Sequence, residues 1–151
     1  LTFPTSLEAL NHYLPHQAPA KISPAELEAL EYLSGQPLGV VLVPPAQPDP
    51  YLPAPRPLYS YESTAYVSAF SRKPSYLEDE VNLNILNIAW QDRKKLITEF
   101  FTTTDSAVAS SFLSQNSIRY LYLSTPRPKL SPSDLGLKKI FSNSEVEIWE
   151  N

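Results

Sequence analysis

Apolar and polar residues alternate with a helical period in the segment that follows Ser23. Pro24 comes directly after this serine, and Glu26 follows it at the third position. That order is typical of a capping box with a proline in the first helical turn. Gly35 supplies a stop signal. The pattern predicts a helix between Ser23 and Gly35, whose buried stripe is formed by Leu27, Leu30 and Leu33.

Three short apolar runs, at 38–43, 64–70 and 118–123, predict β-strands. The first is unbroken by polar residues, which is typical of a strand covered on both faces in a parallel sheet. The second ends at Arg72 and the third follows a short turn at 116–117.

The segment 78–101 carries the longest helical pattern in the chain. Its three acidic residues at 78–80 open the helix, where we expect them to be solvated, and the basic triplet at 93–95 lies nearer the expected C-terminus. One face is formed by Leu83, Leu86, Trp90, Ile97 and Phe101, and is widened by Ile85, Ile88 and Ala89. So wide an apolar stripe predicts a helix packed against a sheet. Asp105 is then expected to cap a further helix over 105–115.

The end of the chain predicts a β-hairpin. A single helical turn is expected at 131–136, followed by strands at 138–142 and 146–149. Alternation places Val146 and Ile148 on one face of the second strand. Because helices and strands alternate through most of the chain, we predict an α/β fold with a mixed, mainly parallel sheet of about five strands and helices packed on it.

The expected domain organisation has two parts. Residues 1–21 form a short helix, at 6–14, and a linker at 15–21, while residues 22–151 form a single α/β domain. Seven prolines fall within 44–57 and predict a long surface loop that cannot donate to a sheet ladder. Spaced proline pairs in this loop also fit a ligand for an aromatic groove, although a proline-rich spacer is the commoner case.

Composition excludes several classes of function. The net charge of −4 offers no basic surface for nucleic acid. The chain has no cysteine, which excludes disulfides and thiolate chemistry. No run approaches the roughly 18 apolar residues of a membrane span. Methionine is absent even at position 1, so we expect an excised segment or a processed product of a longer protein.

No catalytic, cofactor or metal motif stands out. The two histidines, His12 and His16, have helical spacing, but Pro15 lies between them and no acidic third ligand is near in sequence, so surface histidines are expected. The three glycines, Gly35, Gly39 and Gly136, are too far apart for a phosphate-binding loop. We therefore expect no catalytic residue, no cofactor and no metal in this chain.

One possible ligand cleft follows from the predicted strand at 64–70. Ligands of α/β sheets bind at the carboxyl ends of strands. Arg72 ends this strand and Glu62 precedes it, so both could line a cleft together with Tyr61 and Tyr66. An ordinary surface salt bridge between Glu62 and the basic residues at 72–73 is the alternative.

The order of these motifs resembles the C-terminal extracytoplasmic domain of bacterial polytopic membrane proteins of the GT-C glycosyltransferase-like class, related to the dolichyl-phosphate-mannose protein mannosyltransferases. The resemblance covers residues 22–150 and rests on the order of five segments. The segments are Ser23-Pro-Ala-Glu-Leu, Val40-Val-Leu-Val, Tyr66-Val-Ser-Ala-Phe-Ser-Arg, Ile118-Arg-Tyr-Leu-Tyr-Leu and Ile140-Phe-Ser-Asn-Ser-Glu-Val-Glu-Ile-Trp. The sequence departs from the pattern at Ser71, where a glycine is frequent, and in its long proline loop.

The resemblance implies a non-catalytic soluble domain on the extracytoplasmic face of the cell membrane. In such proteins the catalytic carboxylate lies in an early external loop near the first membrane spans, so no catalytic residue is carried over to this chain. The implied role is to assist glycan or acceptor binding, with the rest of the membrane protein as partner and glycan or acceptor polypeptide as ligand. Two alternatives remain. One is a protein–protein interaction module that uses the proline loop, and the other is a small hydrolase or transferase built on Glu62, Arg72 and the tyrosines.

Overall fold

The computed structural model describes residues 18–124 and 126–151 and shows a mixed α/β fold. The main sheet has the strand order β2-β4-β6-β5, with β2 and β4 parallel and the other two pairs antiparallel. Its strands are β2 (Val40–Leu42), β4 (Ile118–Leu123), β5 (Lys138–Ser142) and β6 (Glu147–Glu150). The predicted α/β class and the C-terminal hairpin are therefore confirmed. The main sheet has four strands and one parallel pair, whereas about five mainly parallel strands were predicted, because the segment 64–70 forms a helix and adds no parallel strand.

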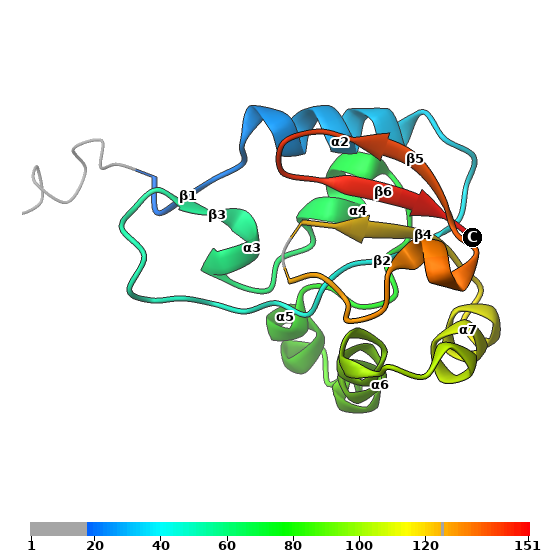
Figure 1. The fold of residues 1–151 in the computed structure, drawn as a ribbon. Helices are drawn as coiled ribbons and strands as arrows, with labels where there is room; N and C mark the ends of the chain where they lie inside the picture. The colour runs from blue at the N-terminus through cyan, green and yellow to red at the C-terminus, as the bar shows by residue number, and fades with distance from the viewer. Residues whose placement is uncertain (1–17, 125) are drawn as a thin grey trace, which may run out of the picture.

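Helices cover both faces of this sheet, which gives three layers (Figure 1). Two helices, α2 (Pro24–Ser34) and α4 (Tyr66–Ser71), pack on one face. The other face carries α6 (Gln91–Thr102) and α7 (Ser106–Gln115). A single 3-10 turn at Pro132–Leu135 precedes the hairpin, as predicted.

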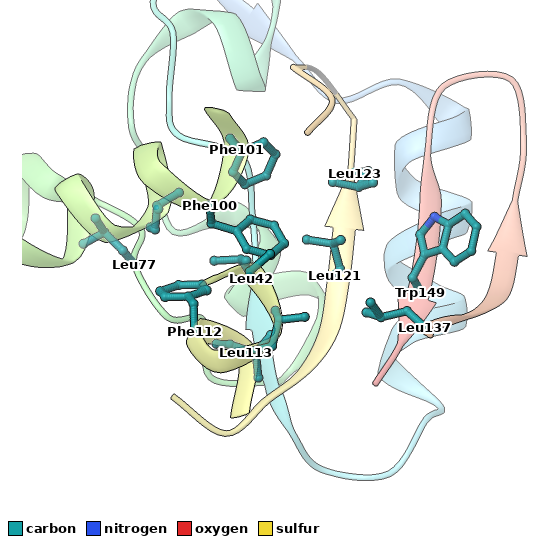
Figure 2. Packing of buried hydrophobic residues seen from close by; sticks show 13 residues of the cluster. Leu42, Leu77, Phe100, Phe101, Phe112, Leu113, Leu121, Leu123, Leu137 and Trp149 are labelled. Carbon is teal, nitrogen blue, oxygen red and sulfur yellow. The ribbon is translucent and has the colours of Figure 1, made fainter. Parts of the chain in front are cut away.

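The central strand β4 divides the core into two clusters because its side chains alternate between the faces. Tyr120 and Tyr122 point toward α2 and α4, whereas Leu121 and Leu123 point toward α6 and α7. Figure 2 shows the second cluster, in which Phe100 lies among the leucines of β2 and β4. The predicted hairpin face is confirmed, since Val146 and Ile148 are buried in the first cluster.

Two helix caps confirm the local start signals. The Ser23 hydroxyl accepts the backbone N–H of Glu26 at 3.0 Å. Asp105 Oδ1 accepts the backbone N–H groups of Ala107 and Val108 at 2.8 and 3.3 Å. In a full capping box the Glu26 carboxyl group would also accept the backbone N–H of Ser23. Here it accepts the Tyr66 hydroxyl instead.

Replacing Asp105 by alanine is expected to lower the free energy of unfolding by about 1 kcal/mol, because two N–H groups of α7 lose their acceptor. Urea denaturation measures the change. Asp92→Ala is the matched control, since Asp92 is exposed in the first turn of α6 and makes only an exposed ion pair with Lys95. An equal loss in both variants would contradict the capping role.

The strand predicted at 64–70 is wrong, because this segment forms α4. Its buried positions are Val67 and Ser71, which are four residues apart, while Phe70 is exposed. That spacing is about one helical turn, and Ala69, which a strand would place on the same face, is exposed. The helix ends at Arg72, whose backbone is left-handed with φ 57°.

The single helix predicted over 78–101 is also wrong. The segment forms α5 (Glu80–Ile85) and α6, with a break that contains Asn87 in a left-handed conformation, φ 55°. Ile97 and Phe101 are buried as predicted, but Leu86 is exposed, and Phe100, which the predicted stripe omitted, lies in the core.

The break reverses the role expected of the basic triplet. Arg93, Lys94 and Lys95 lie near the N-terminus of α6, where the helix dipole does not favour cations. Lys94 is compensated by an ion pair with Glu80, at 2.7 Å. The Glu80 side chain is only 13% exposed and pairs with Lys94. This differs from the solvated carboxylate that the sequence predicted.

The proline loop is tied to the segment that precedes α2. A two-stranded parallel sheet joins β1 (Ala20–Lys21) to β3 (Arg56–Pro57). The loop therefore does donate to a ladder, contrary to expectation, because Arg56 keeps a backbone N–H and donates it to the Pro19 carbonyl at 3.0 Å. A short helix, α3 (Leu58–Tyr61), follows the loop.

The linker predicted at 15–21 thus includes a strand, whereas the helix predicted at 6–14 and both histidines lie outside the described residues. Among residues 18–124 and 126–151, none of the helices combines the length and the hydropathy that a membrane-spanning segment requires.

Candidate functional site

A cleft opens at the carboxyl ends of the parallel strands β2 and β4, beneath the proline loop. Val43 and Ser124, the residues that follow these strands, line its inner pocket. An adjoining outer pocket lies between the proline loop and α5. The two pockets share Ala46, Glu62, Ser63, Glu80 and Lys94, and we call them together the loop cleft. This is where open α/β sheets place ligands.

The two pockets differ in size. The inner pocket has a volume of about 40 Å³, which accommodates a few water molecules. The outer pocket measures about 440 Å³, which is within the range of small-molecule sites. Of the two pockets of the loop cleft, the outer one is therefore the one with room for a ligand of monosaccharide size or larger.

The structure brings three of the four predicted cleft residues to the loop cleft. Glu62 lines both pockets, Tyr61 the outer pocket and Tyr66 the inner one. Arg72 lines neither of them. Tyr66 begins α4 at the cleft and Arg72 follows its last residue, so a helical rise of about 9 Å carries Arg72 away from the pocket wall that Tyr66 lines.

The predicted salt bridge does not form in the described part of the chain, where no ion pair joins Glu62 to Arg72 or Lys73. Lys73 is buried, with 5% of its surface exposed, and donates to the Gln36 carbonyl at 2.7 Å. Burial lowers the pKa of Lys73, and the nearby charge of Arg119 lowers it further.

The proline loop and α6 contribute cleft residues that the sequence did not indicate. The Arg56 guanidinium lies over the Tyr61 ring, 5.7 Å from its centroid. Lys94 lies 5.4 Å from the centroid of the Trp90 ring in addition to pairing with Glu80. A usable signal for the loop was its position directly after β2, because residues that follow a parallel strand lie at the ligand-binding edge.

Backbone hydrogen bonds hold the proline loop over the cleft. The N–H of Asp49 donates to the Ser60 carbonyl at 2.9 Å, which fixes the middle of the loop against α3. The Asp49 carboxylate accepts the N–H of Tyr51, also at 2.9 Å. The outer pocket therefore has one wall of conformationally restricted proline backbone.

Glu78 lines the inner pocket and caps α4. Its two carboxylate oxygens accept the backbone N–H groups of Val67 and Ser68, at 3.0 and 2.9 Å. Burial raises the pKa of Glu78, while hydrogen bonds from Ser68, Ser75 and Val67 act in the opposite direction. Since both oxygens are engaged, this carboxylate serves the fold and is not expected to be solvated, contrary to the sequence-based expectation.

A second buried carboxyl group lies behind Tyr66. Glu26 is fully buried, and its Oε1 accepts the Tyr66 hydroxyl at 3.0 Å. Burial raises the pKa of Glu26 and of Tyr66, and the nearby Glu26 raises the Tyr66 pKa further. Tyr66 therefore stays protonated, and its phenol presents no nucleophile to the cleft.

The outer pocket offers hydrogen-bond donors and acceptors with balanced charge. Its cations are Arg56 and Lys94 and its carboxylates are Glu62 and Glu80. Within residues 18–124 and 126–151, no group of three histidine, cysteine, aspartate or glutamate side chains could hold a metal ion. The arrangement suits a neutral ligand that is rich in hydroxyl groups. No protein-family model matches the chain, and neither does any curated protein or solved structure.

Proposed function

We propose that this chain is a non-catalytic binding domain that holds a glycan, or a glycan-bearing acceptor, in the outer pocket of the loop cleft. The observation that carries the proposal is the composition of that pocket, whose lining combines Tyr61 with opposite charges from Arg56 and Glu62. On the resemblance described above, the domain belongs to a membrane glycosyltransferase-like protein and faces outward from the cell membrane, with the rest of that protein as its partner.

The chemistry of the pocket supports a sugar ligand. A sugar ring has apolar faces, which pack on aromatic rings, and a rim of hydroxyl groups, which need donors and acceptors. The Tyr61 ring lines the pocket and supplies the aromatic surface where the Arg56 guanidinium does not cover it. Arginine and carboxylate groups form the stronger, charge-assisted hydrogen bonds to such hydroxyls.

The rigidity of the loop supports the same proposal. Pro48 and Pro50 line the outer pocket, and proline backbone has little freedom to lose when a ligand binds. Preorganised walls reduce the entropic cost of association. The loop cleft is therefore suited to bind without a large conformational change.

Binding is testable with two soluble probes, a manno-oligosaccharide and an N-acetylglucosamine oligosaccharide, in an NMR titration of the ¹⁵N-labelled chain. We expect at least one probe to shift the resonances of Arg56 and Glu62. Tyr61→Ala and Glu62→Gln are each expected to weaken that binding by about tenfold, which corresponds to a loss of about 1.4 kcal/mol.

Tyr51→Ala is the matched control, because Tyr51 belongs to the same loop, is 94% exposed and lines neither pocket. It should leave the affinity unchanged. If neither oligosaccharide shifts the cleft resonances at millimolar concentration, or if the Tyr51 variant loses binding as Tyr61→Ala does, the proposed function is wrong.

The exposure of Tyr51 favours the second candidate function, a protein–protein interaction module. Its side chain is almost fully exposed, and in the sequence it lies between Pro50 and Pro53. Proline-flanked aromatic residues are suited to grooves of partner domains. The two functions separate cleanly, since Tyr51→Ala would abolish partner capture and spare oligosaccharide binding, while Tyr61→Ala would do the reverse.

A further inference from the structure

Helix α5 and the break that follows it expose a large amount of apolar surface, on the side of the sheet opposite α2 (Figure 1). No residue of α5 is buried, and all of residues 81–89 except Leu83 are exposed. Ile85 is 73% exposed, Leu86 67% and Ile88 47%, and we call these three residues the α5 tip. Proteins rarely leave neighbouring aliphatic side chains so open unless the surface contacts a partner or a membrane.

The backbone of the α5 tip forms its hydrogen bonds locally. The Leu86 N–H donates to the Asn82 carbonyl at 2.9 Å. The Ile88 N–H donates to the Leu83 carbonyl at 2.8 Å, across the left-handed residue Asn87. Unpaired backbone groups are costly in an apolar environment. The tip can therefore enter such an environment without leaving these two N–H groups unpaired.

The exposure and the chemistry of the α5 tip favour a lipid surface over a protein groove. Side chains that are exposed to this extent project from the molecule, and they line neither pocket of the loop cleft. All three are aliphatic, whereas the centres of protein interfaces are enriched in tryptophan, tyrosine and arginine and poor in leucine. Projecting aliphatic side chains bury at the boundary between lipid head groups and acyl chains, which requires no complementary pocket.

The charges beside the α5 tip complement an anionic surface. Although the whole chain has a net charge of −4, the segment 81–98 carries three cations, at 93–95, and one carboxylate, Asp92. Lys94 is neutralised by its ion pair with Glu80. Arg93 forms no ion pair among the described residues, and Lys95 makes only an exposed contact with Asp92, at 3.4 Å, which contributes little. Two cations in the first two turns of α6 can therefore contact lipid phosphates next to the tip.

We propose that the α5 tip docks this chain on an anionic lipid surface, with its aliphatic side chains among the head groups and Arg93 and Lys95 against lipid phosphates. The proposal rests on the proposed function for its biological meaning, because Val81, about one helical turn before the tip, lines the outer pocket. Docking brings that pocket beside the lipid surface, so the glycan that it holds is one displayed there. The docking itself requires no glycan and is a property of the unliganded chain.

Co-sedimentation with vesicles tests the docking, using phosphatidylcholine alone and phosphatidylcholine mixed with phosphatidylglycerol. Each basic residue near an anionic surface strengthens binding about fivefold, so we expect the two cations to make binding to the mixed vesicles about 25-fold tighter. The double variant Ile85→Ser, Leu86→Ser should weaken that binding by more than about tenfold, because its apolar groups no longer bury. Arg93→Gln should weaken it about fivefold at low salt and much less at high salt.

Two substitutions elsewhere on the surface serve as matched controls. Phe70→Ser removes an apolar side chain that is 47% exposed on α4, in the opposite layer of the fold. Lys138→Gln removes an exposed cation from β5. Both variants should bind the mixed vesicles as tightly as the unmodified chain does.

Three results would overturn the proposal. The first is an unmodified chain that does not sediment with the mixed vesicles. The second is an equal loss of binding in Phe70→Ser and in the double variant of the tip. The third is a dimer in sedimentation velocity that the double variant converts to a monomer, which would assign the tip to a contact between two copies of the chain. No oligosaccharide is present in these experiments, so their failure is distinct from a failure of the proposed function.

Discussion

Replacing Phe100 by alanine is expected to cost about 3–5 kcal/mol of the free energy of unfolding, the largest effect of any single change considered for this fold. Phe100 is almost fully buried between α6 and the sheet. Its ring lies 5.4 Å from the rings of both Phe101 and Phe112 (Figure 2). Alanine would leave a cavity at the junction of three elements, and it would also remove two aromatic contacts. Urea denaturation of both proteins measures the difference.

Phe70→Ala provides the matched control, because Phe70 is 47% exposed on α4. It removes the same side chain from a helix of the opposite layer, and its effect should stay below about 1 kcal/mol. Comparable losses for the two variants would contradict the packing of α6 on β2 and β4.

Removing the carboxylate of Glu78 is expected to cost about 2–4 kcal/mol, since Glu78→Ala leaves the backbone N–H groups of Val67 and Ser68 without their acceptor. Hydrogen bonds to a charged acceptor are stronger than neutral ones, and α4 has no capping side chain of its own at Ala65. Urea denaturation measures the loss of stability. In a hydrogen-exchange experiment on Glu78→Ala, the amides of α4 should exchange faster than those of α7.

Glu78→Gln gives a graded comparison, because the amide keeps one acceptor oxygen but loses the charge. It is expected to fall between the unmodified chain and Glu78→Ala. If Glu78→Ala changed stability by less than about 0.5 kcal/mol, the typical effect of a surface substitution, the capping of α4 by this residue would be refuted.

Local sequence signals correctly predicted the helix starts at which a nearby side chain accepts the backbone N–H groups. Ser23 and Asp105 accept hydrogen bonds from N–H groups two or three positions ahead. The starts of α2 and α7 can therefore be predicted from residues that are close together in the sequence. The strand β4 and the hairpin were likewise predictable, because each contains a short apolar run. The side chains of β4 are buried on both faces of the sheet, and β6 buries Ile148 on one face and Trp149 on the other.

Long-range contacts decided the elements that were predicted wrongly. The segment 64–70 has the composition of a strand, yet Glu78, ten or more positions away, caps it as a helix. The segment 78–101 has the composition of one helix, yet Lys94 turns back to pair with Glu80 across the break at Asn87. Neither partner can be identified from local propensity, which tertiary contacts routinely override.

The candidate site shows the same division. Glu62, Tyr61 and Tyr66 were identified through a strand that does not exist, and they reach the cleft because α3 and the start of α4 lie beside the carboxyl ends of β2 and β4. Arg72 was placed with them for the same reason, and the helical rise of α4 separates it.

By itself the sequence determined the α/β class, the caps of α2 and α7, the central strand and the terminal hairpin, because these depend on periodicity and on contacts within a few residues. Only the tertiary structure decided the form of α4, the break between α5 and α6 and the roof that the proline loop makes over the cleft. It alone also joined Glu26 to Tyr66, because that hydrogen bond links residues 40 positions apart and exists only once α2 and α4 are packed on the same face of the sheet.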